Sequence, residues 1–270
     1  MDLSKFLALI DSERLWLTSA EVLAADDPHE GTLSTAHFLH RRLNSVDDLP
    51  LRSRTELVAH YSVGTDGSPA AAFNMYVMTQ EQIGLMTQAG RRNYYVSCWH
   101  AEGRESVAMW KIYSAPGPGV AIISDSERME RALRSSEEKM YLGRVRYFDE
   151  TRESIDWSNG FNVIMSKRAS FAYEREVRLV YWDTEDIFDP LASAAWNEAS
   201  LRYDDVRSNP EPPRPGISVE CNLRELVREV VISPLAPSWY EALVTSLCRK
   251  LGYSWKIRRS RLMDEPDLLP

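Results

Sequence analysis

The stretch from Lys167 to Trp182 (KRASFAYEREVRLVYW) is the strongest indication of how this chain folds. Residues 172–182 are rich in Val, Tyr, Leu and Trp, a composition that predicts a β-strand. Because side chains alternate between the two faces of a strand, Glu174, Glu176 and Arg178 are expected on one face. The other face is expected to join the core, and it carries Tyr173, Arg175, Val177, Leu179 and Tyr181.

The polar face of this strand has two interpretations. Two carboxylates at positions 174 and 176 repel each other, and Arg178 neutralises only part of their charge. One interpretation is a solvated strand face with a surface ion pair. The other is a catalytic strand on which one glutamate acts and its neighbours orient it. The pattern alone leaves both interpretations open.

The composition is ordinary for a soluble globular protein. The 270 residues are 44% hydrophobic and 27% charged, which is enough for one large domain. We expect a single domain over residues 1–270 with an irregular loop at about 183–216, where residues 209–216 are rich in proline. The formal charge of −8 argues against broad, sequence-independent binding to nucleic acid, which needs a basic face.

Several features bear on metals and on cellular location. The three cysteines form no CxxC or Cys/His zinc pattern, and a reducing compartment fits them. His37 and His40 have no third ligand at a convincing spacing, so no metal is predicted. Because the chain has no run of about eighteen apolar residues, no membrane span is expected. We therefore expect a cytoplasmic protein, and the sequence does not indicate its oligomeric state.

The order of the expected elements indicates an α+β fold with mixed or antiparallel sheets and surrounding helices. Helical patterns are expected at 3–12, 32–46, 54–63, 69–88, 105–113, 125–136, 160–169 and 237–251. In addition to 172–182, strands are expected at 15–18, 93–98, 119–123, 140–148, 216–220, 227–233 and 253–257.

The segment from Asp26 to Gly31 (DDPHEG) predicts a turn, because Pro and Gly interrupt regular structure. Asp27 and Glu30 are three residues apart and resemble a capping box for a following helix. In the alternative interpretation, Asp27, His29 and Glu30 reach into a pocket.

Several stretches, taken in order, resemble the bacterial domain-of-unknown-function family 2971. They are LWLT then DDPHEG, YYVSCW then ESVAMWKIYSAPGPGVAI, VRYFD, SKRASFAYEREVRLV, and ISVECNLRELVREVVISP before the last helix. Their order and spacing agree along nearly the whole chain, and MW-x-x-Y and YE-x-E-x-R are the tightest pieces. The chain differs from the family in starting at the first helix without a Tyr-x-Tyr strand, and in Asp26 and Phe171, where Asn and Trp are usual.

The resemblance implies a fold similar to ADP-ribosyltransferases and an NAD-consuming activity, either ADP-ribosyl transfer or NAD hydrolysis. By that similarity Glu176 is the catalytic acid with Glu174 beside it, and Tyr113 flanks the nicotinamide. A fixed carboxylate suits this chemistry, because the glycosidic bond of NAD breaks through an oxocarbenium-like transition state. The cofactor-binding residues expected with it are Tyr113, Trp110, Lys167, Arg178, Asp27 and Glu30, with Lys167 or Arg178 on the pyrophosphate.

Two other functions stay open. The first is a non-catalytic binding or regulatory module of a bacterial stress or antiviral system, which would explain the absence of the family's first strand. The second is a metal-dependent nuclease, since carboxylate clusters bind Mg²⁺, although the net charge argues against a nucleic-acid substrate. Its ligands would be Asp27, Glu30, Glu174 and Glu176. In each case the expected partner is an unidentified protein or nucleic-acid target.

Overall fold

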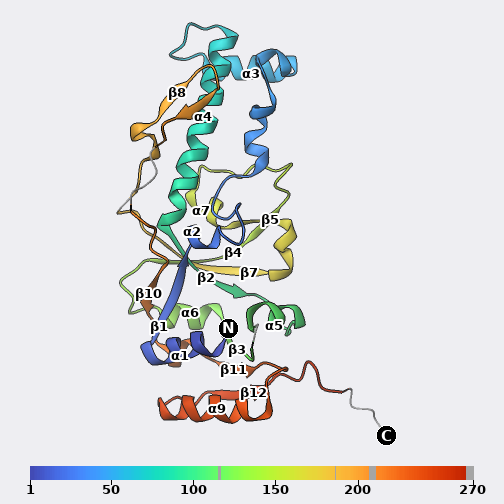
Figure 1. The fold of residues 1–270 in the computed structure, drawn as a ribbon, viewed down its shortest axis with the longest axis vertical. Helices are drawn as coiled ribbons and strands as arrows, with labels where there is room; N and C mark the ends of the chain where they lie inside the picture. The colour runs from blue at the N-terminus through green and yellow to red at the C-terminus, as the bar shows by residue number, and fades with distance from the viewer. Residues whose placement is uncertain (115–116, 186, 207–210, 266–270) are drawn as a thin grey trace.

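The computed structural model describes residues 1–114, 117–185, 187–206 and 211–265. Its centre is a five-stranded antiparallel sheet in the order β10–β1–β2–β7–β4 (Figure 1). Strand β7 lies between β2 and β4, so hydrogen bonds hold both of its edges. The strands are β1 (Arg14–Ser19), β2 (Tyr94–His100), β4 (Met140–Arg144), β7 (Glu176–Trp182) and β10 (Gly216–Glu220).

A three-stranded mixed sheet forms the base of the molecule in Figure 1. Strand β11 (Glu229–Ile232) pairs in parallel with β12 (Lys256–Arg259) and antiparallel with β3 (Val120–Ile123). The main hydrophobic core joins both sheets to helices that bury one apolar face each. These helices are α1 (Leu3–Ser12), α6 (Ser126–Ala132), α8 (Leu223–Leu226) and α9 (Ser238–Lys250).

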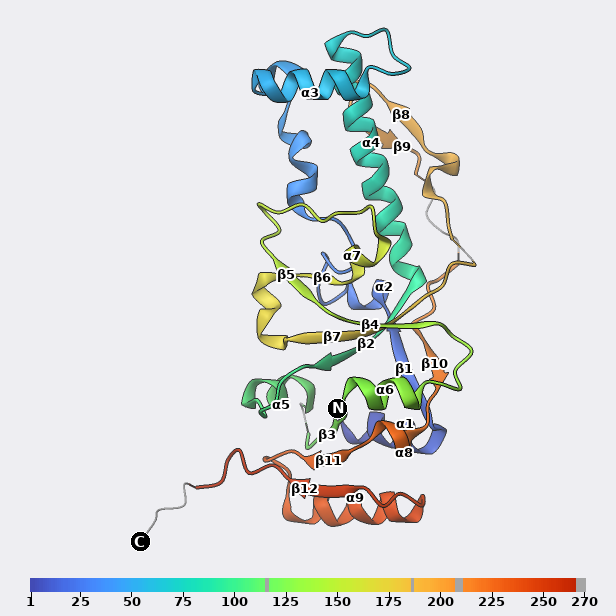
Figure 2. The ribbon, with the colours of Figure 1, turned by 180° about the vertical axis from the view of Figure 1, so that it is seen from behind.

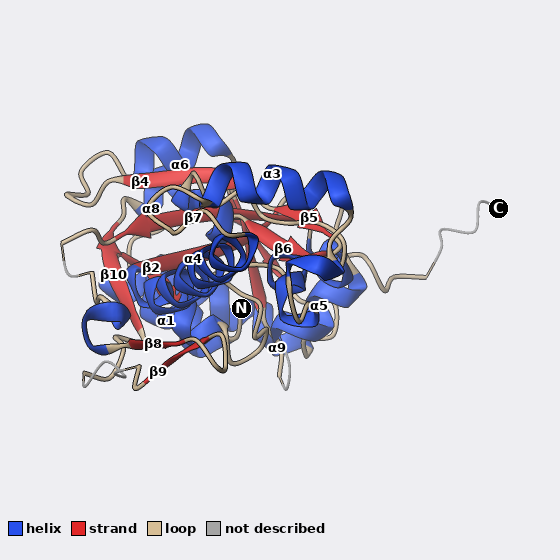
Figure 3. Ribbon diagram, turned by 90° about the horizontal axis from the view of Figure 1, so that it is seen from above, coloured by secondary structure: helices blue, strands red, loops and turns tan. Residues whose placement is uncertain are grey.

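Helix α4 (Pro69–Gly90) rises away from the central sheet, as Figures 1 and 2 show, and Figure 3 views it nearly end-on. The Ser68 hydroxyl accepts a hydrogen bond from the Ala71 N–H at 3.1 Å, which caps the first turn. Helix α3 (Leu51–Tyr61) and the hairpin of β8 (Ala195–Asn197) and β9 (Arg202–Asp204) pack against α4. Their separate cluster of buried side chains consists of Val46, Leu57, Ala72, Phe73 and Val77.

The remaining elements are short. They are α2 (Ala20–Leu23), α5 (Val107–Ser114), α7 (Gly160–Ile164), β5 (Arg146–Phe148), β6 (Ser166–Arg168) and the 3-10 helices η1 (Thr35–Arg42), η2 (Val46–Asp48), η3 (Arg91–Asn93), η4 (Ala169–Glu174) and η5 (Pro190–Ser193). Together the elements confirm an α+β fold with antiparallel and mixed sheets, while the likeness to ADP-ribosyltransferases stays a prediction. Within the described part of the chain, no helix is both long and apolar enough to cross a membrane.

Some predicted elements differ from the structure. The helix expected at 32–46 is the 3-10 helix η1, and the helix expected at 160–169 ends at Ile164, where β6 follows. The strand expected at 140–148 is two strands in different sheets. The region 183–216 is not wholly irregular, since it contains η5 and the β8–β9 hairpin, and its residues 186 and 207–210 lie outside the described ranges. Only at residues 166–168 is a strand found where a helix was expected, because short runs do not distinguish a helix from a strand.

The prediction for residues 172–182 is wrong about where the strand begins and about Tyr173, and the structure decides between the two interpretations of the polar face. The strand begins only at Glu176, because η4 precedes it and Arg175 adopts a left-handed conformation with φ of 43°. On the polar face, Glu176, Arg178 and Val180 are buried, because helices α2 and α7 cover this part of the sheet. A solvated polar face is therefore excluded, and Tyr173, which was expected in the core, is half exposed.

Candidate functional site

Charged side chains from distant segments meet in a buried network on the face of the central sheet that helices α2 and α7 cover. Arg178 is its centre, and its side chain is 0% exposed. The Arg178 guanidinium donates to Glu176 Oε1 from Nε at 2.7 Å and to Glu30 Oε2 from Nη2 at 2.9 Å. Its Nη1 donates to Glu30 Oε1 and to the Ile164 carbonyl.

Lys167 extends this network towards the end of β7. Its Nζ lies 2.5 Å from Glu174 Oε2 and 3.2 Å from Glu176 Oε2, so one ammonium group bridges two carboxylates. The carboxylates of Glu30, Glu174 and Glu176 face the cations Lys167 and Arg178, and the network carries one net negative charge when all are ionised. Because burying charge is costly without partners, such an arrangement holds its members in fixed positions.

The surroundings keep Glu176 and Lys167 ionised. Burial by itself would raise the pKa of Glu176, but the charge and hydrogen bonds of Arg178, with the charge of Lys167, hold that pKa below its ordinary value. Burial by itself would lower the pKa of Lys167, and the charge of Glu176, with the hydrogen bond to Glu174, raises it above its ordinary value. At neutral pH the Glu176 carboxylate is therefore charged and Lys167 is protonated.

Local structure places each member of the network. Glu176 opens β7, and its backbone N–H donates to the Tyr147 hydroxyl at 2.8 Å. Lys167 lies on β6, which pairs in parallel with β5. Glu30 comes from the tight turn that ends at Gly31, whose φ of +61° favours glycine.

The interpretation of Asp27 and Glu30 as a capping box is wrong, because residues 28–34, directly after Asp27, form no helix. Asp27 Oδ1 accepts instead from the His29 N–H at 3.1 Å and from Arg168 Nη2 at 2.6 Å. Both carboxylates point into the protein, and His29 lines a separate pocket. The alternative, in which Asp27, His29 and Glu30 reach into a pocket, fits only for His29, because the two carboxylates are engaged by Arg168 and Arg178.

Solvent approaches the network beside Glu174. The Tyr113 side chain on α5 is 48% exposed, and its hydroxyl donates to Glu174 Oε1 at 3.3 Å. Strand β1 pairs with β2 only through Thr18 and Ser19 and then diverges from it (Figure 1), so the outer half of β2 pairs with β7 alone. The exposed Cys98 lies on that half of β2, directly opposite Arg178.

The structure brings most of the predicted site residues together. Glu30, Glu174, Glu176, Lys167 and Arg178 share the network, Tyr113 joins it at Glu174, and Asp27 lies beside it through Arg168. Arg178 has no exposed surface to offer a pyrophosphate, contrary to the expectation for this residue.

Trp110 stands apart from the network. It is buried and donates through Nε1 to Glu105 at 3.2 Å, so the structure does not place its ring at the site.

Sequence reasoning missed Tyr147 and Cys98. Tyr147 accepts the backbone N–H of Glu176, and Cys98 is the register partner of Arg178. The pairing of β2 with β7 is the signal for Cys98, and it also sets His100 opposite Glu176, whereas Tyr147 lies on β5 and is not indicated by that pairing. The Nδ1 of His100 hydrogen-bonds the Glu174 carbonyl at 2.5 Å, so this histidine helps to hold the η4–β7 turn.

The carboxylates of the predicted nuclease site are engaged in ion pairs. Asp27 pairs with Arg168, and the others pair with Arg178 or Lys167. In the ranges that the structure describes, no group of three or more His, Cys, Asp or Glu side chains is arranged to hold a metal ion. No family model, curated protein or solved structure matches the chain.

Proposed function

We propose that this protein cleaves the bond between nicotinamide and ribose in NAD, as an ADP-ribosyltransferase or an NAD hydrolase. The observation that carries the proposal is the bridge of Glu174, Lys167 and Glu176 beside the exposed ring of Tyr113. The resemblance of the sequence to the domain-of-unknown-function family 2971, which implies an ADP-ribosyltransferase-like fold, supports the same chemistry.

The geometry suggests a distinct role for each glutamate. When the glycosidic bond breaks, its electron pair leaves with nicotinamide and positive charge develops on the ribose ring. The Glu174 carboxylate is the group that a ribose hydroxyl reaches by displacing the Tyr113 hydroxyl, whose bond of 3.3 Å is long. Once in contact, that carboxylate stabilises the developing charge, and the Tyr113 ring offers a surface for stacking.

Glu176 acts through its neighbours in this proposal. Its Oε1 accepts from Arg178 and its Oε2 accepts from Arg178 and Lys167, and its side chain is only 4% exposed. It therefore positions Lys167, which in turn holds Glu174. Because Arg178 and Glu30 are fully engaged with each other, they serve as the structural anchor of the network.

The test is nicotinamide release from NAD followed by proton NMR. Wild type should release nicotinamide, and Glu174→Gln should abolish the release while retaining the circular dichroism spectrum and the affinity for NAD. Glu56→Gln is the matched control, because Glu56 is exposed and pairs with the exposed Arg52 across one turn of α3. Wild-type rates in Glu174→Gln would refute the proposal.

A non-catalytic binding module is the second candidate, and the burial of Glu176 and Arg178 favours it. A network of this kind can fix a fold without taking part in catalysis. If wild type releases no nicotinamide and NAD does not raise the melting temperature, this second candidate replaces the first. A raised melting temperature without release would retain the NAD site and identify it as a binding site.

A further inference from the structure

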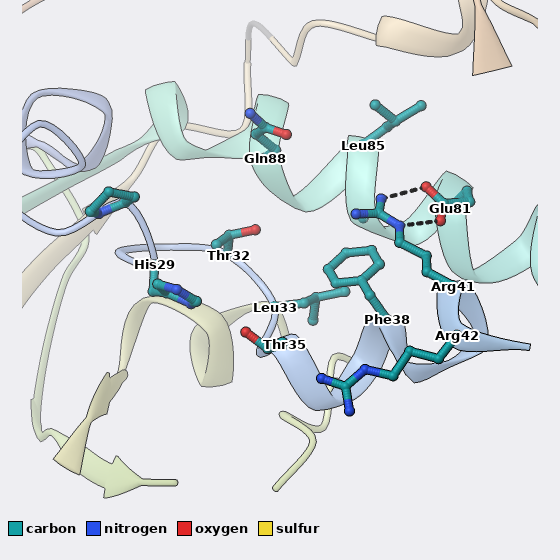
Figure 4. Close-up of a pocket in the computed structure, with 12 residues that line it drawn as sticks. His29, Thr32, Leu33, Thr35, Phe38, Arg41, Arg42, Glu81, Leu85 and Gln88 are labelled. Carbon is teal, nitrogen blue, oxygen red and sulfur yellow. Dashed lines mark hydrogen bonds and ion pairs between the residues drawn. The ribbon is translucent and has the colours of Figure 1, made fainter. Parts of the chain in front are cut away.

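A pocket of about 420 Å³ lies between the turn at residues 28–35, the 3-10 helix η1 and the inner half of α4 (Figure 4). Its volume falls in the range of sites for small molecules. The turn that supplies His29 to this pocket also supplies Glu30 to the buried network and Asp27 to Arg168 beside it. Neither carboxylate lines the pocket. The pocket is therefore separate from the proposed NAD site.

Polar side chains with unused hydrogen-bonding capacity surround this space (Figure 4). Within the described ranges none of them has a hydrogen bond or an ion pair through its side chain. Each is able to donate a hydrogen bond, so the wall is rich in donors. They are His29, Thr32, Thr35, Arg42 and Gln88.

The charge of the pocket is positive, because its one carboxylate is already neutralised. Glu81 accepts from Arg41 Nε at 2.7 Å and from Arg41 Nη2 at 2.6 Å, and it also contacts His40. Burial by itself would raise the pKa of Glu81, but these hydrogen bonds lower it to about 2, so the carboxylate stays ionised. Among the residues that the structure describes, Arg42 has no such partner, and its side chain lines the pocket of a chain whose formal charge is −8.

The remaining wall is apolar and rigid. Leu33 and Leu85 line it together with Phe38. The Arg41 guanidinium covers one face of the Phe38 ring at 4.3 Å, and the ring packs so closely on α4 that a Cβ at Gly84 would lie 2.6 Å from it. A ligand therefore meets both apolar side chains and hydrogen-bond donors in this pocket.

We infer that this pocket binds a small organic phosphate. The planar fork of Arg42 and the hydroxyl groups of Thr32 and Thr35 suit the several oxygens of a phosphate group. The organic part contacts Leu33 and Leu85. The inference does not depend on NAD cleavage, because no residue of the Glu174–Glu176 network lines this pocket.

Phenyl phosphate is a suitable probe, since it joins a phosphate to an apolar ring and contains neither the nicotinamide nor the ribose of NAD. Calorimetric titration of the whole chain should show binding that is at least about tenfold tighter than that of inorganic phosphate. Phenol alone should show no binding. Equal affinity for inorganic and phenyl phosphate would overturn the organic part of the inference, and the absence of any binding at about 10 mM would overturn all of it.

Two arginine variants test the location. Arg42→Gln should weaken the binding of phenyl phosphate by about tenfold or more, because a charge-assisted hydrogen bond is lost. Arg134→Gln removes the same charge from an exposed arginine at the end of α6 and should leave the affinity unchanged. Equal weakening in both variants would mean general electrostatic attraction and would refute the site.

Proton NMR of the histidine rings gives an independent readout. Binding should shift the ring signals of His29 and leave those of His60, which lies on α3 outside the pocket. Assignment follows from the signals that disappear in His29→Asn. Shifts at His60 without shifts at His29 would place the ligand elsewhere and overturn the inference.

Discussion

Replacing Glu30 with glutamine is predicted to destabilise the protein by about 3 kcal/mol, the lower end of the range for breaking a buried ion pair. Glu30 is 3% exposed, and its two oxygens accept from the two terminal nitrogens of Arg178. Water does not reach Arg178 to replace the lost oxygen. Glutamine also turns its own N–H₂ donors towards a guanidinium that only donates.

The lower end of the range applies because Arg178 keeps one counter-ion. Glu176 still accepts from Arg178 Nε at 2.7 Å after the substitution. A loss of about 3 kcal/mol is a large share of the 5–15 kcal/mol that is typical of folded domains. At about 2 °C per kcal/mol for a chain of this size, the melting temperature should fall by about 6 °C.

Urea denaturation followed by tryptophan fluorescence measures this loss, with equal slopes required for wild type and variant. Glu56→Gln is the control, because it makes the same chemical change in an exposed pair with Arg52. The control should lose no more than about 0.5 kcal/mol. If Glu30→Gln loses less than about 1 kcal/mol, the Arg178 charge does not depend on this partner, and the argument from burial is wrong.

Three further predictions concern pH, thiol chemistry and Tyr113. Because the pKa of Glu81 is lowered from 4.5 to about 2, its contribution to stability is present above about pH 4.5 and lost as the pH falls towards 2, so Glu81→Gln should flatten the acid limb of a stability–pH profile. Cys98 is exposed while Cys221 and Cys248 are buried, so a thiol reagent should modify only Cys98 in the native chain, and slowly, because desolvation and the Glu176 carboxylate raise the pKa of its thiol well above the ordinary value; modification of the two buried thiols without denaturant would contradict the packing. Tyr113→Phe should change the free energy of unfolding by less than about 0.5 kcal/mol, because a half-exposed hydroxyl makes one long hydrogen bond, and a larger loss in urea denaturation would mean that this bond holds α5 in place.

The sequence by itself determined the elements whose stabilising contacts are local. The helix at Leu3–Ser12 and the long helix at Pro69–Gly90 agree with their apolar spacing and with the capping residues Asp2 and Ser68. The later part of strand β7 follows from its β-branched and aromatic residues. The turn before Gly31 follows from the glycine, which adopts a positive φ there. In each case the decisive interactions lie within a few residues along the chain.

Only the tertiary structure decided how the polar residues of those elements are used. Alternation predicts a polar face with Arg178 on it, but helices α2 and α7 cover that face and bury it. The Arg178 guanidinium pairs there with Glu30, which lies 148 residues away in the sequence. A left-handed Arg175 then removed Glu174 from the strand and left it bridged to Lys167. The phosphate pocket likewise unites Thr32 with Gln88 from another segment. Such contacts depend on how sheets and helices stack, and that information is spread over the whole chain and absent from any short stretch.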